Sequence, residues 1–265
     1  MSAADFISSR SNPRFKRLRA LVDDTREPRR QGRTIADGIH LVASCLDHGA
    51  VVEQLLMSES GQENDEIKAL INRAAGADCV IIRDALFREL SGVSSPTGVA
   101  AVIAIPPQSD GLLSGDALLL DAVQDAGNVG TLLRTAAAAG VKDVVLGNGC
   151  AGAWTPRVLR AGQGAHFGLR IREQVDLVAL LETASYMSVA TVVDTSETLY
   201  ELDLTVPVIW IFGNEGAGIS LELMTHAQRR VSIPMKAGTE SLNVASAAAI
   251  CLFEAFRQRR LLEMQ

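Results

Sequence analysis

The chain has 265 residues, of which 48% are hydrophobic and 21% charged, so it is long enough for one large or two modest globular domains. Its net charge of −6 argues against a general nucleic-acid-binding surface, and no apolar run approaches the ~20 residues of a membrane span. Because the N-terminus lacks the basic-then-apolar pattern of a signal peptide, we expect a soluble cytoplasmic protein with no membrane partner.

Basic residues are concentrated at the start of the chain. Residues 1–33 contain nine Lys or Arg and four Asp or Glu, a net charge of +5 that leaves −11 for the remainder. A basic segment on an otherwise acidic protein can hold phosphate locally. The alternative is that these side chains form only a solvated helix face.

The first hundred residues indicate a small α/β domain. A short helix is expected after Asn12-Pro13, followed by a break over 24–32. The pattern predicts helices over 37–48, 63–75 and 84–90, and strands over 51–57, 79–82 and 98–105. We assign residues 1–105 to this domain and the Pro- and Gly-rich residues 106–115 to a linker.

Residues 116–265 alternate between strands and helices. Strands are expected over 117–121, 143–147, 187–193, 207–212 and 230–233, with a weaker one at 168–171. Helices are expected over 128–139, 156–163, 176–184, 220–227 and 243–260. The strands are continuous apolar runs, which favour a parallel sheet covered on both faces.

Neither metal nor dinucleotide chemistry is favoured. The four cysteines and four histidines are scattered, so we expect reduced thiols and no metal site. Residues 147–152 spell G-x-G-x-x-G after a strand, but the helix start expected at Thr155-Pro156 comes too late for a dinucleotide fingerprint. A nucleotide-dependent oxidoreductase is therefore an alternative that this spacing disfavours.

Three segments, 118–134, 211–220 and 233–246, each lead from a hydrophobic strand into a polar, glycine-rich loop and then into a helix start. Such loops direct backbone N–H and C=O groups toward one spot. Three of them in one α/β region predict a small-molecule site.

These segments resemble the three motifs of the SpoU (TrmH-like) RNA ribose 2′-O-methyltransferases, in the knotted SPOUT superfamily. The matching residues are Asn128-x-Gly130-x-x-x-Arg134, Gly213-Asn-Glu215-Gly-x-Gly218 and Ile233-Pro-Met-x-x-Gly238-x-x-Ser241-Leu-Asn243. The resemblance implies a C-terminal methyltransferase domain, residues 116–265, threaded as a trefoil knot. It also implies S-adenosylmethionine as the cofactor and a homodimer formed through this domain, with the active site at the dimer interface.

The resemblance implies five catalytic residues: Asn128, Arg134, Glu215, Ser241 and Asn243. Arg134 would be the catalytic arginine. Because arginine stays protonated, it would either stabilise the developing alkoxide or pass its proton to an RNA phosphate. Ser241 would place that phosphate. Asn243 would shape the methyl-transfer cavity and could also cap the following helix.

Glu215 would bond Asn128 across the two loops, with a role as carboxylate base as the alternative. Asn128 itself is expected to cap the helix that carries Arg134. For the cofactor, the resemblance implies main-chain contacts at Gly213, Ile233 and Leu242, and a place in the same pocket for Met235 and Asn243. Residue type alone would instead make Ile233 and Leu242 core residues.

The N-terminal region resembles the substrate-binding domain of the family. Arg29-Arg30-Gln31 and Asp37-Gly38 match its start, although the family more often has glutamate at the position of Asp37, a departure that puts no chemistry in doubt. The predicted RNA-binding residues are Arg14, Lys16, Arg29, Arg30 and Arg33.

A separate RNA-binding domain favours a large structured substrate, ribosomal RNA over transfer RNA. The alternative from another class is a non-catalytic RNA-binding or ribosome-assembly factor on the same fold. The intact set of motif residues argues against it.

Overall fold

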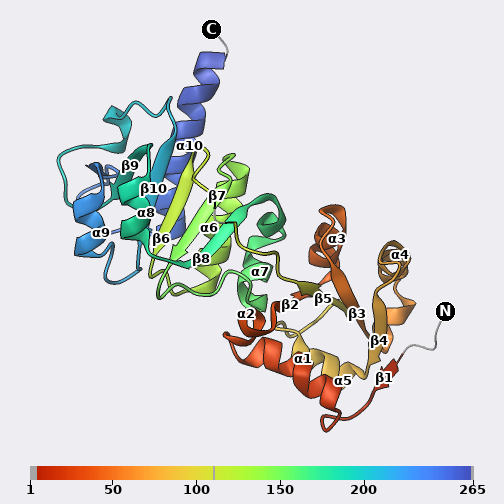
Figure 1. The fold of residues 1–265 in the computed structure, drawn as a ribbon. Helices are drawn as coiled ribbons and strands as arrows, with labels where there is room; N and C mark the ends of the chain where they lie inside the picture. Colours follow the sequence, from red (N-terminus) through yellow and green to blue (C-terminus); the bar gives the residue numbers. More distant parts are fainter. Residues whose placement is uncertain (1–4, 110, 264–265) are drawn as a thin grey trace. The chain divides into compact units, whose positions relative to one another are not determined.

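The computed structural model describes residues 5–109 and 111–263. Residues 1–4, Asp110 of the expected linker and residues 264–265 lie outside this description. The chain forms two compact units (Figure 1). The first runs to Pro107 and also includes Trp154–Phe167, and the second comprises Gln108–Ala153 and the chain from Gly168 onward. The segment Trp154–Phe167 falls within the range expected for the methyltransferase domain.

The first unit contains a five-stranded mixed sheet in the order β1-β4-β3-β5-β2. Its strands are β1 (Asp5–Ile7), β2 (Arg33–Asp37), β3 (Val52–Ser58), β4 (Asp78–Ile82) and β5 (Val99–Ala104), and β5 runs antiparallel to both neighbours. Its helices are α1 (Pro13–Asp23), α2 (Glu27–Gln31), α3 (Ile39–Asp47), α4 (Asp65–Arg73), α5 (Asp84–Leu90) and α7 (Pro156–Gly162).

Helix α1 forms where the sequence predicts it. Asn12 caps it by accepting the Arg14 backbone N–H at 2.8 Å, and Pro13 occupies the first turn. Phe15, Leu18 and Leu21 then repeat at helical spacing and are buried against the core of this unit.

The sequence-based expectation is wrong for the segments around α1. Strands β1 and β2 and helix α2 were not predicted, and the helix expected from Asp37 begins at Ile39 instead. Gly38 has a φ of 106°, which breaks the chain between β2 and α3. Helix α2 has only five residues, with Pro28 in its first turn and Gly32 directly after its last residue, so it is too short for periodicity to reveal it.

The second unit contains a six-stranded sheet in the order β11-β9-β10-β6-β7-β8, in which every neighbouring pair is parallel. Its strands are β6 (Ala117–Asp121), β7 (Asp143–Gly147), β8 (Arg170–Val175), β9 (Met187–Thr191), β10 (Val208–Gly213) and β11 (Arg229–Val231). Its helices are α6 (Ala126–Ala138), α8 (Leu177–Thr183), α9 (Leu221–His226) and α10 (Val244–Glu263). The predicted parallel sheet is confirmed, whereas the trefoil knot stays a prediction.

The centre of this sheet is fully covered. Residues 117–120 of β6 and 208–212 of β10 are almost completely buried. Helices α8 and α9 pack on one side of the strands, and α6 packs against α10. The first strand in sequence, β6, lies beside β10, so the strand order changes direction there and the loops that follow both strands leave the same edge. Open α/β sheets bind ligands at such a switch point.

At the start of β7, the buried carboxylate of Asp143 pairs with the exposed Arg170. Its carboxylate accepts hydrogen bonds from Arg170 at 2.7 Å and from the Ser114 backbone N–H at 3.1 Å. Burial raises the pKa of Asp143, but the hydrogen bonds from Arg170 and Ser114 lower it by more, so its pKa in the folded protein lies below its ordinary value.

We expect Asp143→Asn to lower the free energy of unfolding at pH 7 by about 1–3 kcal/mol, because it leaves Arg170 without its carboxylate. The stabilisation is fully present above the unfolded-state pKa of about 3.9 and is lost as the pH falls through the lower folded pKa. Urea unfolding at pH 7 and at pH 3 checks this. In the control Asp47→Asn, which breaks the exposed pair with Arg73, the change should stay below about 0.5 kcal/mol. An equal effect of both variants would contradict the prediction.

Candidate active site

A cavity of about 370 Å³ opens at the carboxyl ends of β9 and β10. Its walls come from the loop after β9, the loop after β10, the segment after β11 and the first turns of α10. All of these segments belong to the second unit. The volume lies within the range of small-molecule sites, about 300–1,000 Å³.

The structure brings all five predicted cofactor-binding residues to this cavity: Gly213, Ile233, Met235, Leu242 and Asn243. Of the predicted catalytic residues, Glu215 and Ser241 also line it. Ile233 is only half-buried and Leu242 is 37% exposed, so neither side chain is part of the core. The alternative that these two residues serve only core packing is therefore wrong.

The loop after β10 has the shape that its glycines allow. A Cβ on Gly213 would lie 2.2 Å from the carbonyl carbon of Gly218, so no larger residue fits there. Asn214 and Gly218 exchange two backbone hydrogen bonds of 2.9 Å, and Gly218 has a φ of 72°. The chain thereby folds back on itself and forms one wall of the cavity.

Asn214 holds this loop, and the sequence analysis did not select it. Its side-chain oxygen accepts the backbone N–H groups of Gly216 and Ala217 at 2.9 Å, and its amide donates to the Ala122 carbonyl at 2.8 Å. Its place between Gly213 and Glu215 in the second motif was the available signal.

Three motif side chains form one hydrogen-bonded bridge. The Asn128 amide donates to Glu215 Oε1 at 2.8 Å, and the Asn243 amide donates to Asn128 Oδ1 at 2.9 Å. Glu215 also accepts the backbone N–H groups of Gln124 and Asp125, at 3.4 and 3.3 Å. The bridge joins the loops after β6 and β10 to the start of α10, so residues 128, 215 and 243 form one site.

The environment of Glu215 keeps it ionised. Partial burial raises its pKa, but the hydrogen bonds from the Asn128 side chain and from backbone N–H groups lower it by more, so the net pKa lies below its ordinary value. Because an ionised carboxylate only accepts hydrogen bonds, Glu215 fixes the orientation of the Asn128 amide.

The expected helix caps are partly wrong. Helix α6 begins at Ala126, and its N-cap is Asp125, whose carboxylate accepts the Asn128 backbone N–H at 2.8 Å. Asn128 therefore lies in the first turn, and its side chain is free to reach Glu215. Asn243 does cap α10, since its side-chain oxygen accepts the N–H groups of Ala245 and Ser246 at 2.9 and 3.3 Å.

Arg134 is the one predicted catalytic residue that joins neither the cavity wall nor the bridge. It is exposed on α6, and its side chain makes no hydrogen bond or ion pair with any residue that the structure describes. Its guanidinium therefore has all its donors available to a ligand.

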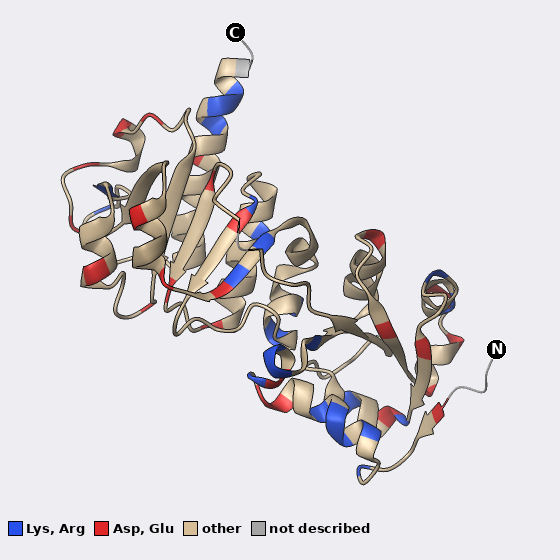
Figure 2. Cartoon of the chain, in the orientation of Figure 1, with Lys and Arg blue, Asp and Glu red and all other residues tan. Residues whose placement is uncertain are grey.

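The predicted RNA-binding residues belong to the first unit, where Lys and Arg gather on α1 and α2 (Figure 2). Three of the five already have carboxylate partners. Arg14 pairs with Asp5 and Asp78, Arg30 with Glu27 and Arg33 with Glu53.

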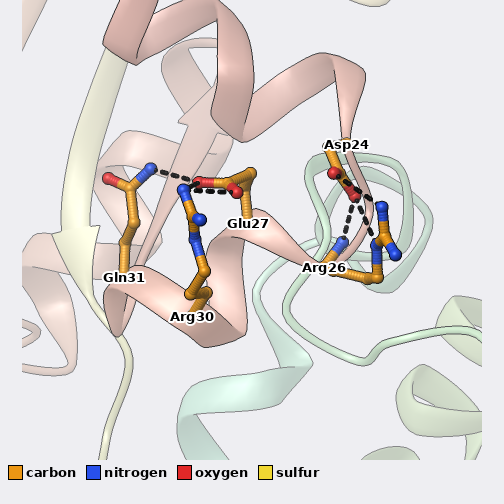
Figure 3. Close-up of polar contacts among 5 residues, drawn as sticks. All are labelled: Asp24, Arg26, Glu27, Arg30 and Gln31. Atoms are coloured by element: carbon orange, nitrogen blue, oxygen red, sulfur yellow. Dashed lines mark hydrogen bonds and ion pairs between the residues drawn. The ribbon is translucent and has the colours of Figure 1, made fainter.

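Lys16 and Arg29 are exposed, with no such partner in the described part of the chain. Figure 3 shows Glu27 holding both Arg30 and Gln31, at 2.8 and 2.7 Å. The paired arginines are partly neutralised by carboxylates, whereas the charges of Lys16 and Arg29 are not.

Within the described residues, no dinucleotide-binding loop of the usual form, no metal site and no membrane-spanning helix is found. Helix α7 begins at Pro156, four residues after Gly152, so the Gly147–Gly152 loop does not run directly into a helix. Over residues 5–109 and 111–263, no group of three His, Cys, Asp or Glu could hold a metal, and no helix is long and apolar enough to cross a bilayer.

The close approach of Gly213 to the Gly218 backbone predicts that a larger residue at position 213 destabilises the loop. Gly213→Ala should lower the free energy of unfolding by about 1–3 kcal/mol, because the added methyl group collides with the Gly218 backbone. The matched control is Gly216→Ala, where the new Cβ would meet only Asn214 Oδ1 at an ordinary 3.6 Å. Urea denaturation of both variants checks this, and similar stabilities would show that the close approach does not matter.

The donor set fits S-adenosylmethionine. Apolar side chains of Ile219, Ile233 and Leu242 can pack against an adenosine group, and the backbone of the glycine-rich loop can bond its polar edges. Ser241, Asn243 and Glu215 place polar groups at the same cavity.

Comparison with known proteins identifies the fold and the chemistry. The SpoU rRNA Methylase family model matches residues 117–253, and the MRM3-like substrate binding domain model matches residues 12–101. The chain is 35% identical to an uncharacterized tRNA/rRNA methyltransferase of Synechocystis, over 96% of this chain and 94% of that protein. It is 32% identical to the 23S rRNA (guanosine(2553)-2′-O)-methyltransferase RlmP of Bacillus subtilis, over 93% of this chain and 97% of that protein.

Among solved structures, the AdoMet-bound rRNA methyltransferase from Sinorhizobium meliloti superposes with a TM-score of 0.83 at 27% identity, covering 96% of this chain and 98% of that one. The predicted fold class, cofactor and activity, an S-adenosylmethionine-dependent RNA ribose 2′-O-methyltransferase, are thereby confirmed. The chain belongs to the SpoU rRNA methylase family.

Proposed function

We propose that this protein methylates a ribose 2′-hydroxyl group of ribosomal RNA. The observation that carries the proposal is the bridge Glu215–Asn128–Asn243 beside a cavity that every predicted cofactor residue lines. The substrate class is supported by the Bacillus subtilis relative, which is named for 23S rRNA, and by the match of residues 12–101 to a substrate-binding domain.

When bound, S-adenosylmethionine supplies the electrophilic methyl group. The residues of this chain must then hold the ribose hydroxyl in line with that group and accommodate the proton it loses. We assign Gly213, Ile233, Met235 and Leu242 to holding the cofactor. Asn243 shares that pocket and, through Asn128, is fixed relative to Glu215.

Glu215 acts by positioning. A general base works best when its pKa is raised toward the working pH, but the surroundings of Glu215 lower its pKa. Its carboxylate accepts three hydrogen bonds, all from residues at the start of α6 and in the loop before it. The alternative role as carboxylate base is therefore disfavoured.

We assign Arg134 to contact with the RNA, because its side chain has no partner among the described residues. Its exposed guanidinium can stabilise the developing alkoxide, or it can act with an RNA phosphate that takes up the proton. Ser241, at the cavity and two residues before the cap of α10, is assigned to placing that phosphate. On the basic surface of the first unit, Arg14, Lys16, Arg29, Arg30 and Arg33 would hold the rest of the substrate.

The working form is proposed to be a homodimer joined through the second unit. Helix α10 exposes an apolar face in which Phe253 is 45% and Phe256 42% exposed, with their rings 6.0 Å apart. Leu261 and Leu262, nearer the C-terminal end of the same helix, are also exposed. A second copy that covers the face would remove several large apolar groups from water and would bring another chain to the site.

A cytoplasmic location of the protein stays a prediction.

The function is tested with labelled S-adenosylmethionine and separate pools of unmodified ribosomal and transfer RNA, with products read as nucleosides by mass spectrometry. We expect a 2′-O-methyl nucleoside from the ribosomal pool, and at least a ~100-fold lower kcat for Arg134→Ala with unchanged binding of S-adenosylhomocysteine. The control is Lys142→Ala, an exposed cation next to the amino end of β7, at the edge of the sheet away from the cavity. Cofactor binding without transfer to either RNA would favour the non-catalytic alternative.

The dimer is tested with Phe256→Glu, which places a charge in the proposed interface. We expect sedimentation equilibrium to show a dimer for the unaltered protein and at least a tenfold weaker association for the variant, since each buried Phe is worth about 1.5–3 kcal/mol. Leu221→Glu on α9 is the control, because Leu221 is 74% exposed on another helix. A monomeric unaltered protein with full activity would refute the dimer.

A further inference from the structure

The first unit carries a second cavity, about 260 Å³ in volume, that none of the three motifs uses. Helix α1 forms one wall with Arg14, Arg17, Leu18 and Leu21. These residues follow the i, i+3, i+4, i+7 spacing of a single helix face. The two leucines are buried and give this wall its apolar part, while the partly exposed Arg14 and the exposed Arg17 give it positive charge.

The opposite wall comes from the sheet, where a β-bulge directs two successive residues to one side. The pairing of β3 with β5 shifts between Val52 and Gln54. Glu53 pairs with Arg33 at 2.9 Å, and Gln54 lines the cavity together with Arg33. Successive strand residues ordinarily point to opposite faces, so the bulge is what brings both near Arg33.

The charged groups of this cavity are fixed to different degrees. Arg14 is held by Asp5 and Asp78, and Arg33 by Glu53. Arg17 has no carboxylate partner within the described residues. The cavity therefore has two positioned guanidinium groups whose charges are balanced and a third, at Arg17, that is available to an anion.

Two amide side chains complete the cavity. Gln31 is held by a hydrogen bond of 2.7 Å to Glu27 (Figure 3). In contrast, Gln54 Oε1 is buried and accepts no hydrogen bond from any residue that the structure describes. A buried acceptor without a partner costs stability, so its retention is explained if a ligand N–H group supplies the bond.

We propose that this cavity binds one unpaired nucleotide of the RNA substrate. Its base lies over Leu18 and Leu21 and donates an amino N–H to Gln54, and its phosphate pairs with Arg17. Adenine, guanine and cytosine carry such an amino group, whereas uracil does not. Apolar contact, one amide and arginine are the usual means of holding an unstacked base and its phosphate. This inference rests on the proposed RNA substrate and assigns a specific contact to the first unit.

The test compares Gln54→Met and Arg17→Gln in the full-length protein, with binding of unmodified ribosomal RNA measured by fluorescence anisotropy. We expect each variant to raise the Kd for RNA about tenfold, with unchanged binding of S-adenosylhomocysteine to the second unit. Gln54→Met should also leave the melting temperature unchanged or higher, because it removes an unsatisfied buried acceptor. Weaker RNA binding with undiminished stability is a combination that a merely structural Gln54 would not produce.

Arg88→Gln is the matched control, an exposed arginine on α5 of the same unit that does not line the cavity. If Arg88→Gln raised the Kd for RNA as much as Arg17→Gln, the effect would be one of overall positive charge, and the proposed site would be refuted. Unaltered RNA binding by both cavity variants would refute it as well. Micromolar binding of free nucleoside monophosphates, lost in Gln54→Met, would overturn it in favour of a metabolite site. Because binding is measured apart from methyl transfer, an unaltered protein that binds RNA without methylating it refutes only the proposed function.

Discussion

The site depends on one carboxylate that reaches across the sheet edge. Glu215 leaves the loop after β10 and accepts hydrogen bonds from the backbone and the side chain at the start of α6. The strands β6 and β10 are adjacent and parallel, so these two loops emerge together although about ninety residues separate them in sequence. The lowered pKa of Glu215 keeps the acceptor charged, and this charge fixes how Asn128 and then Asn243 are turned. Three separate glycine-rich loops thereby behave as one rigid surface.

Much of this arrangement could be predicted from the sequence because the residues of the site occur at fixed spacings within three motifs. Gly213, Ile233, Met235 and Leu242 occupy positions of the second and third motifs, and the structure brings all four to one cavity. The apolar runs of β6 and β10 also predict a buried parallel sheet without further information.

The rest could not be predicted because it depends on contacts between distant residues. The choice between Asp125 and Asn128 as the cap of α6 is settled by Glu215, which engages the Asn128 amide from another loop. The five-residue helix α2 and the three-residue strand β1 lack the length that periodicity requires. The bulge between Val52 and Gln54 has no signal in the composition, since it exists only in the pairing of β3 with β5.

The place of helix α7 has a consequence for how the protein is divided. The chain leaves the second unit after Ala153 and returns at Gly168, and between these points α7 packs on β2 while Arg160 pairs with the buried Asp37 at 2.9 Å. Neither unit is therefore one continuous stretch of sequence. A fragment ending near residue 107 would uncover β2 and leave Asp37 without its arginine. Exchange of substrate-recognition modules between relatives would thus have to carry two separate gene segments, so the two units are expected to have diverged together.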